Sequence, residues 1–180
     1  FVKIKLSGKK KPAVFLDRDG VLNKSLIKNG KPKAPLLMKE FKFLHGVKKT
    51  INKLRKKFVL IIITNQPEIK KGRLKINTLN KMNKKIINEL KIKNIYVCPH
   101  DDKDMCKCRK PKNGLIESAI KKFNIDRKAS FLIGDRKKDI DAGIKSKLKT
   151  IYIKSNYNEL KPNNFDYMCK NLHQSLKYIK

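Results

Sequence analysis

Tryptophan is absent from this sequence, and acidic residues are scarce: 15 Asp and Glu stand against 47 Lys and Arg among 180 residues. Long apolar runs are also missing, since the longest, residues 58–63, falls far short of the roughly 18 residues of a membrane-spanning helix. No secretory signal precedes the first predicted strand, which favours a cytoplasmic protein with no membrane partner. The length predicts a single domain, residues 1–180, with a sizeable core.

The formal charge of +32 has two interpretations. A nucleic-acid-binding protein carries such an excess. A genome rich in A and T also produces it, because its codons favour Lys, Asn and Ile. The lysines are spread along the whole chain, and no basic run is interleaved with aromatic residues that could stack on bases. The pattern therefore favours the codon explanation and argues against nucleic acid as a partner.

Apolar periodicity predicts an alternation of strands and helices. Short apolar runs predict strands over residues 13–16, 58–63, 94–97, 130–133 and 150–153. Helical spacing predicts helices over residues 45–57, 73–91, 114–123, 139–145 and 171–179. Residues 1–11 are expected to form a basic N-terminal arm, and residues 24–40 a loop. The alternation predicts an α/β fold with a three-layer, Rossmann-like parallel sheet.

Polar motifs directly follow three of the predicted strands. Asp17-Arg-Asp19-Gly follows the first, Thr64-Asn65 the second, and Gly-Asp135 the fourth. Because ligands of such sheets bind outside the carboxyl ends of the strands, we expect these motifs to meet in one site.

Asp17 and Asp19 can both face one crevice if the chain turns sharply at Gly20. One carboxylate can attack phosphorus and form an acyl-phosphate. The other can protonate the leaving oxygen and then activate water. The alternative is a surface Asx-turn, which Asp-x-Asp-Gly also forms.

Thr64, Asn65, Arg109 and Lys110 are candidates for binding phosphate and substrate. A hydroxyl and an amide can hold phosphoryl oxygens, although Thr and Asn are also favoured at helix N-caps. Lys110 offers a point charge, and Arg109 a planar fork for a second phosphate or sugar hydroxyls.

Asp135 is the candidate that completes a Mg²⁺ site with Asp17 and the backbone carbonyl of Asp19. Few protein oxygens and several waters are typical of protein-bound Mg²⁺. Asp139 can either support Lys110 or cap the helix that follows it.

Three of the four cysteines lie within eleven residues and alternate with a histidine. Cys98, His100, Cys106 and Cys108 form a closed tetrahedral set for a structural Zn²⁺ that would staple one loop. Fortuitous clustering is the alternative. Cys169 stands alone and is expected to be an ordinary thiol in a reducing compartment.

In type and order, these motifs resemble those of the haloacid dehalogenase superfamily of phosphatases over residues 13–143. Segments 15–23, 64–66 and 98–111 are similar to the D-glycero-D-manno-heptose 1,7-bisphosphate phosphatases. The related histidinol-phosphate phosphatases share the zinc loop. Two segments depart from the heptose type: Pro67-Glu68 replaces the usual Ser-Gly, and the stretch between His100 and Cys106 is short.

The resemblance implies a HAD-like fold without a large cap domain, with Asp17 as nucleophile and Asp19 as general acid and base. It implies a Mg²⁺ on Asp17, Asp19 and Asp135 and a Zn²⁺ on the Cys–His set. It also implies that substrate or its phosphate is bound by a set of polar and basic residues: Thr64, Asn65, Arg109, Lys110 and Arg136.

The activity implied is Mg²⁺-dependent hydrolysis of a phosphomonoester on a small sugar, the 7-phosphate of heptose 1,7-bisphosphate. Histidinol phosphate is one alternative substrate, and a 3′-phosphorylated polynucleotide is another. A non-catalytic, zinc-stapled binding module is a third class. A monomer is expected, because the site needs no residue from a partner.

Overall fold

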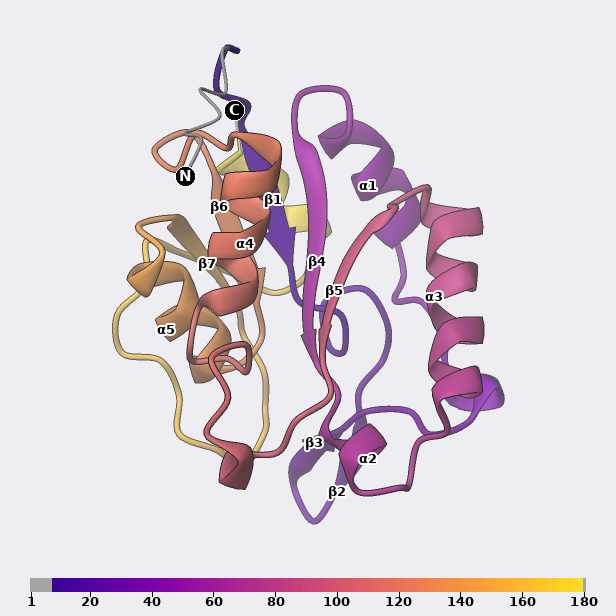
Figure 1. The fold of residues 1–180 in the computed structure, drawn as a ribbon. Helices are drawn as coiled ribbons and strands as arrows, with labels where there is room; N and C mark the ends of the chain where they lie inside the picture. Colours follow the sequence, from indigo (N-terminus) through magenta and orange to yellow (C-terminus); the bar gives the residue numbers. More distant parts are fainter. Residues whose placement is uncertain (1–7, 180) are drawn as a thin grey trace, which may run out of the picture.

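The computed structural model describes residues 8–179. Figure 1 shows strands alternating with helices, as the periodicity predicts. The main sheet contains β1 (Ala13–Leu16), β4 (Val59–Asn65), β5 (Asn94–Cys98), β6 (Phe131–Gly134), β7 (Lys149–Ile153) and β8 (Tyr167–Cys169). The α-helices are α1 (Val47–Leu54), α2 (Pro67–Lys70), α3 (Ile76–Leu90), α4 (Gly114–Phe123) and α5 (Lys137–Lys145). Short 3₁₀ helices span Met38–Glu40, Asp102–Asp104 and His173–Lys177.

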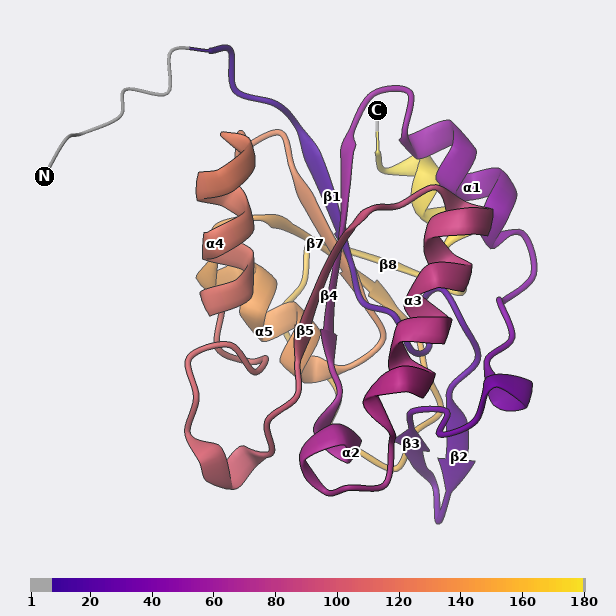
Figure 2. The same cartoon turned by 45° about the vertical axis from the view of Figure 1, so that its right-hand side comes forward.

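The six strands form one parallel sheet in the order β5-β4-β1-β6-β7-β8. Figure 2 shows α1 and α3 on one face of the sheet and α4 and α5 on the other. These are the three layers expected for βαβ units with right-handed crossovers. The predicted fold class is therefore confirmed.

The two faces of β1 explain why the sheet lies at the centre. All four residues of β1 are fully buried. Val14 and Leu16 join the core under α1 and α3, while Ala13 and Phe15 join the core under α4. Successive strand residues face opposite sides, so a strand covered on both sides must be apolar throughout. The continuous apolar run in β4 has the same cause.

Residues 24–40, predicted as a loop, instead hold a small antiparallel hairpin of β2 (Leu26–Lys28) and β3 (Lys31–Lys33). The turn is Asn29-Gly30, and both residues have positive φ, 52° and 71°. Asn-Gly is the residue pair that two-residue hairpin turns favour. This signal was present in the sequence, but the prolines around it masked the strand pattern. Apart from this hairpin, residues 8–179 contain no inserted subdomain, in agreement with the expected lack of a large cap.

Several further elements differ from the prediction, among them α1, which spans Val47–Leu54 within the predicted 45–57. The one-turn helix α2 follows β4 directly, so the helix-start interpretation of Thr64-Asn65 was partly correct, although the residue at the N-cap is Gln66. The predicted terminal helix over residues 171–179 is a shorter 3₁₀ helix, and strand β8 precedes it. Helix α5 begins at Lys137, two residues before the predicted start.

Part of the predicted basic arm, residues 1–7, lies outside the described residues. The end of the arm that the structure describes is attached to the fold, because the Lys11 backbone N–H donates to the carbonyl of Asn124 at 3.0 Å. None of the helices described between residues 8 and 179 is long and apolar enough to cross a bilayer.

Candidate active site

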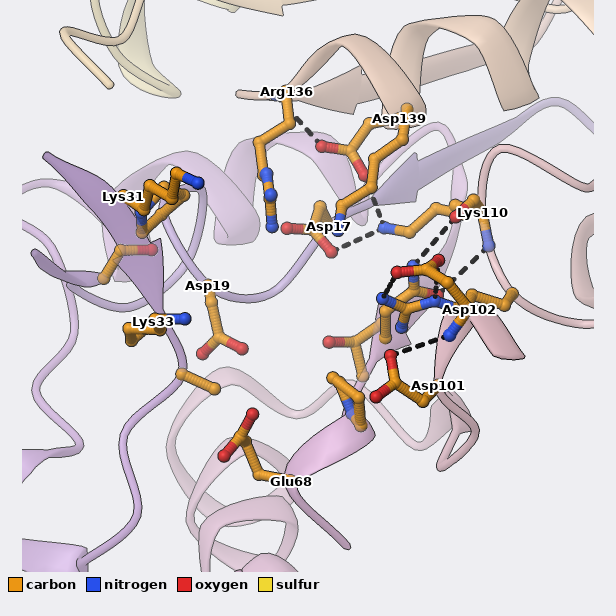
Figure 3. A pocket seen from close by; sticks show the side chains of 18 of the residues that line it. Asp17, Asp19, Lys31, Lys33, Glu68, Asp101, Asp102, Lys110, Arg136 and Asp139 are labelled. Carbon is orange, nitrogen blue, oxygen red and sulfur yellow. Dashed lines mark hydrogen bonds and ion pairs between the residues drawn. The ribbon is translucent and has the colours of Figure 1, made fainter. Parts of the chain in front are cut away.

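The carboxyl ends of β1, β4 and β6 meet at one edge of the sheet, where a pocket of about 240 Å³ opens. Asp17 directly follows β1, Thr64 and Asn65 end β4, and Asp135 directly follows β6. Figure 3 shows this pocket, with Lys110 among the residues that line it. Lys110 belongs to the segment that follows Cys108. The three motifs thus converge as their positions after the strands predict.

Lys110 is the centre of the charged network. Its ammonium lies 2.6 Å from Asp17 Oδ1, 2.8 Å from Asp139 Oδ1 and 2.7 Å from the carbonyl oxygen of Ile63, to which it donates. Lys110 is buried, and Figure 3 shows its side chain between the two carboxylates. Such buried, charge-assisted contacts hold the ammonium in one position.

Burial changes the acidity of this pair. Burial raises the pKa of Asp17 to about 6, against the opposing effect of Lys110. Burial also acts to lower the pKa of Lys110, but the carboxylates of Asp139 and Asp17 outweigh it and raise that pKa above its ordinary value. Lys110 is therefore a fixed positive charge, while Asp17 titrates near neutral pH.

Asp135 is a second buried carboxylate, and one of its oxygens is unpartnered. Its Oδ2 accepts a hydrogen bond of 2.6 Å from the Tyr157 hydroxyl, whereas its Oδ1 has no partner among the described residues. Burial raises its pKa well above the ordinary value, and Asp139 and Asp17 add to that rise. Gly20 lies so close that a Cβ there would be 1.8 Å from Oδ2, which explains the glycine at this turn.

Asp139 performs both of the roles considered for it. Its Oδ1 pairs with Lys110, and its Oδ2 accepts the backbone N–H of Arg136 at 3.1 Å at the start of α5. Its oxygens lie within 4.8 Å of those of Asp17 and Asp135, but both are already engaged. Asp17 and Asp135 therefore remain as the carboxylates that face one another with a free oxygen.

The carboxylate of Asp19 is not part of that group of three. It lines the pocket and accepts hydrogen bonds from Arg18, Asn23 and Gln66. Its side chain is thus engaged by protein donors, and the role of its backbone carbonyl as a Mg²⁺ ligand stays a prediction.

Thr64 and Asn65 differ in what they offer to a ligand. The Thr64 hydroxyl accepts from Gln66 at 3.0 Å and keeps its own proton for donation into the pocket. The Asn65 side chain instead exchanges two hydrogen bonds, each of 3.1 Å, with the backbone of Lys110. Asn65 therefore holds the Lys110 segment in place, a role that the sequence pattern does not reveal.

Arg109 and Arg136 both line the pocket, and each is paired with an acid. Arg109 donates to both oxygens of Asp102 at 2.7 and 3.2 Å and to the carbonyl of His100. Arg136 donates to Glu159 at 2.8 Å. Glu159 belongs to the segment between β7 and β8. Neither arginine is isolated, so a ligand would have to share or displace these partners.

The four predicted zinc ligands lie together in the loop between β5 and α4. Their ligand atoms are all within 4.8 Å of one another: Cys98 Sγ is 3.2 Å from Cys108 Sγ and 3.8 Å from Cys106 Sγ, and His100 Nδ1 is 3.2 Å from Cys108 Sγ. All the cysteines are free thiols, and Cys169 lies apart, buried at the end of β8. A tetrahedral Zn²⁺ with Zn–S bonds of about 2.3 Å requires S···S distances of ~3.8 Å. The three S···S distances here are 3.2, 3.3 and 3.8 Å, so the donor types fit the metal and two sulfur pairs would have to widen to admit it.

Several residues of the site carry no sequence signal of their own. Arg18, Asn23 and Gln66 surround Asp19, Tyr157 holds Asp135, and Lys138 lines the pocket. In so basic a chain, Lys138 and Arg18 cannot be distinguished from surface cations by type alone. Tyr157 comes from a loop far from the motifs, and only the fold brings it to Asp135.

Comparison with known proteins places these motifs in a family. The family model for polynucleotide kinase 3 phosphatase matches residues 14–159. The D-glycero-alpha-D-manno-heptose-1,7-bisphosphate 7-phosphatase of Campylobacter jejuni is 33% identical over 177 residues, covering 95% of this chain and 97% of that protein. The D-glycero-beta-D-manno-heptose-1,7-bisphosphate 7-phosphatase of Haemophilus influenzae is 34% identical, covering 76% of this chain and 78% of that protein.

Solved structures agree on the fold. A D,D-heptose 1,7-bisphosphate phosphatase from B. bronchiseptica, complexed with magnesium and phosphate, superposes with a TM-score of 0.80 at 23% identity and covers 93% of this chain and 99% of that one. A HAD-like phosphatase from Mesorhizobium loti gives a TM-score of 0.74 at 20% identity, covering 96% and 87%. From the matched family model and the curated relatives, this chain belongs to the HAD-like phosphatases that include the heptose 1,7-bisphosphate 7-phosphatases.

Proposed function

We propose that this phosphatase removes the 7-phosphate of a heptose 1,7-bisphosphate through an aspartyl-phosphate on Asp17. The observation that carries the chemistry is Asp17 held by Lys110 beside the unpartnered oxygen of Asp135. The names of the curated relatives support the choice of sugar. They differ in the anomer, so the proposal leaves the anomer open.

Residues of this chain supply the reacting groups for both steps, the formation and the hydrolysis of the aspartyl-phosphate. An Asp17 oxygen attacks phosphorus while the bond to the sugar oxygen breaks, and the Asp19 carboxylic acid gives that oxygen its proton. The Asp19 carboxylate then takes a proton from water as the water oxygen attacks the same phosphorus. The bond to Asp17 breaks, inorganic phosphate leaves, and both aspartates are regenerated. The positive charge of Lys110 attracts the non-bridging oxygens, and the Thr64 hydroxyl donates to one of them.

Mg²⁺ fits beside these residues. Asp17 and Asp135 are buried carboxylates with oxygens that face one another, and the Asp135 Oδ1 has no hydrogen-bond partner within residues 8–179. Buried polar atoms rarely lack partners, and a carboxylate oxygen is the ligand type that Mg²⁺ prefers. The ion, when bound, supplies positive charge that reduces the repulsion between the phosphoryl group and the Asp17 carboxylate. We assign Zn²⁺ to the Cys–His set, where it would act structurally, in a reducing compartment such as the cytoplasm.

The charge of the pocket supports a small bisphosphate over a polynucleotide. Seven acidic and seven basic side chains line it, although the chain as a whole carries +32. A surface that binds a nucleic-acid backbone is expected to be strongly basic, and this one is balanced. Three of its lysines, Lys31, Lys33 and Lys138, make no ion pair among residues 8–179, so they are available for a second phosphate.

Phosphate release from three substrates tests the proposal: heptose 1,7-bisphosphate, histidinol phosphate and a 3′-phosphorylated DNA oligomer, each with Mg²⁺ and with EDTA. We expect Mg²⁺-dependent release from the first alone. Asp17→Asn should abolish turnover while leaving the melting temperature within a few degrees of wild type. Preference for either other substrate would retain the chemistry and reject the sugar. Normal turnover by Asp17→Asn would reject the nucleophile.

A further inference from the structure

The Asp19 carboxylate is held by three donor residues from two segments, Arg18 and Asn23 in the turn after β1 and Gln66 after β4. Its Oδ1 accepts from Arg18 Nε at 3.1 Å, from Arg18 Nη2 at 3.0 Å and from Asn23 Nδ2 at 2.8 Å. Its Oδ2 accepts from Arg18 Nη2 at 2.9 Å and from Gln66 Nε2 at 2.7 Å. Figure 3 shows Asp19 turned away from the cluster formed by Asp17, Lys110 and Asp139. Its position is therefore set by its neighbours.

Arg18 is unusual because its charged side chain is completely buried. Its exposure is 0%, and its guanidinium lies over the ring of the buried Phe41, 5.5 Å from the centroid. Asp19 is its ion-pair partner, and Nη1 has no partner among the described residues. Burying a cation costs much free energy unless a well-oriented anion compensates. This costly burial occurs at Arg18, the residue that lies between Asp17 and Asp19 in the sequence.

Gln66 links Asp19 to the phosphate-binding end of β4. The same amide nitrogen that donates to Asp19 also lies 3.0 Å from the Thr64 hydroxyl, to which it donates. Its backbone N–H donates to the carbonyl of Cys98 at 2.7 Å, which fixes it against β5. Gln66 is fully buried. Any shift of the amide would thus move Asp19 relative to the hydroxyl that holds the phosphoryl group.

We propose that Arg18, Asn23 and Gln66 form a positioning clamp that sets where Asp19 exchanges protons with the leaving oxygen and with water. The proposal rests on the proposed function, in which Asp19 is the general acid and base. The clamp residues act through Asp19 and do not touch the phosphorus. Losing the clamp should therefore impair the two proton transfers and spare the attack of Asp17.

Leaving groups of different basicity separate these steps. A p-nitrophenolate departs without a proton, whereas a sugar alkoxide needs one. In a clamp variant, p-nitrophenyl phosphate should still form the aspartyl-phosphate at the wild-type rate. Hydrolysis of that intermediate and release of the sugar should both be slow.

The test uses rapid-quench kinetics with Mg²⁺ on p-nitrophenyl phosphate and on heptose 1,7-bisphosphate. For Gln66→Met we expect a stoichiometric burst of nitrophenol within about threefold of the wild-type rate, and a loss of about a hundredfold in steady-state turnover and in sugar release. Asp19→Asn is the benchmark and should behave likewise. The double variant Asp19→Asn/Gln66→Met should lose little more than Asp19→Asn alone, because both changes remove one function.

Thr150→Val is a matched control. It removes a buried hydroxyl that donates to Asp166 at 2.8 Å, away from the pocket. It should lower the melting temperature without altering the ratio of burst to steady-state rate. Equal losses in burst and turnover for Gln66→Met, or full additivity with Asp19→Asn, would overturn the clamp.

A second variant and a second substrate distinguish failure of the clamp from failure of folding or of the proposed sugar. If Gln66→Met fails to fold, Arg18→Lys keeps the buried charge but loses the two-nitrogen fork, and should show the same selective loss. Turnover of p-nitrophenyl phosphate by wild type with a burst, but without release of phosphate from heptose 1,7-bisphosphate, would reject the proposed sugar. The burst and steady-state rates on p-nitrophenyl phosphate would then still test the clamp. No Mg²⁺-dependent turnover of either substrate by wild type would overturn both proposals.

Discussion

At the scale of single residues, Lys138 is the side chain that we expect to bind the second phosphate of the substrate. It is half-buried, lines the pocket and pairs with no acid among the described residues, and burial together with Arg136 lowers its pKa to about 8. An uncompensated, partly buried cation favours an anion beside it. Its neighbour Lys137 is paired with Asp141 at 2.8 Å and does not line that pocket. The two lysines thus form a natural comparison.

Lys138→Gln should raise KM for heptose 1,7-bisphosphate by about tenfold, since a charge-assisted hydrogen bond to the second phosphate would be lost. KM for p-nitrophenyl phosphate, which has one phosphate, should change little. Lys137→Gln removes the same charge one residue away and should leave both values near wild type. Steady-state kinetics on the two substrates measures this, and parallel changes for both variants would argue for a general charge effect.

The raised pKa of Asp17 predicts how pH and Mg²⁺ together affect the stability of the folded protein. Its pKa rises from 3.8 to about 6, so the metal-free folded state binds this proton more tightly than the unfolded chain. That contribution to stability is present below pH 3.8 and is lost as pH rises through about 6. Mg²⁺ requires the ionised carboxylate, so its stabilising effect should grow over the same range.

Thermal unfolding with and without Mg²⁺ measures this effect. The rise in melting temperature caused by Mg²⁺ should be small at pH 5 and clearly larger at pH 7.5. Asp135→Asn, which removes a ligand charge, should reduce the rise at pH 7.5. An equal Mg²⁺ effect at both pH values in wild type would contradict the assignment of the metal to Asp17.

Some residues of the candidate site can be predicted from the sequence, and others cannot. Asp17, Thr64 and Asp135 could be found because each stands at the end of an apolar strand, and parallel strands bring those ends together. Arg18 and Gln66 could not be found, because their importance comes from complete burial beside Asp19. The amide of Asn65 bonds to the Lys110 backbone, which the sequence does not reveal, and its predicted contact with substrate stays a prediction.

At the scale of elements, we expect the Cys–His loop, residues 98–108, to connect Zn²⁺ binding to catalysis. Cys108 is two residues from Lys110, so a metal that closes the loop restrains the backbone that carries the ammonium. Ion pairs of Lys70 with Asp104 and of Lys71 with Asp101 tie the same loop to α2 and the residue after it, at 2.7 and 2.9 Å. These pairs are partly exposed and contribute little individually.

Cys106→Ser should therefore lower zinc content below the expected one ion per chain, lower the melting temperature and reduce kcat, because Lys110 loses its fixed position. Metal analysis, thermal unfolding and phosphate release measure the three effects. Cys169→Ser changes a cysteine outside the cluster and should keep both zinc and activity. Full activity of a zinc-free Cys106→Ser protein would show that Asn65 and the carboxylates hold Lys110 without the metal.

Elements with a strong apolar period could be predicted, and those held by long-range contacts could not. Helix α3 and strand β4 carry their own pattern. Strand β8 has only three residues and exists because it pairs with β7 at the sheet edge. The β2–β3 hairpin depends on two residues, Asn29 and Gly30, within a segment otherwise rich in lysine and proline.

Across the whole molecule, charge is distributed unevenly. Seven of the 15 acidic residues line the pocket, so the basic excess lies on the rest of the chain. Polyanions should therefore bind to the surface away from the pocket, and this binding should depend strongly on salt.

A DNA oligomer lacking a 3′-phosphate should bind at low salt and dissociate steeply as salt rises toward 0.2 M, as a fluorescence anisotropy titration would show. It should not raise KM for heptose 1,7-bisphosphate even where it is bound. Competitive inhibition by the oligomer would mean that the polynucleotide does enter the pocket. The monomer expected from the sequence stays a prediction, testable by light scattering in the same buffers.

The Cys–His loop has a further consequence for how such enzymes diversify. Zn²⁺ on the four candidate ligands would close its base, and Asn65 holds the backbone of Lys110. The apex, residues 101–105, is thereby separated from the catalytic ammonium, yet Asp101 and Asp102 from that apex form part of the pocket wall. Insertions, deletions and substitutions at the apex can reshape what the pocket admits while the reacting groups stay in register. New substrate preferences can thus evolve at this apex without rebuilding the catalytic centre.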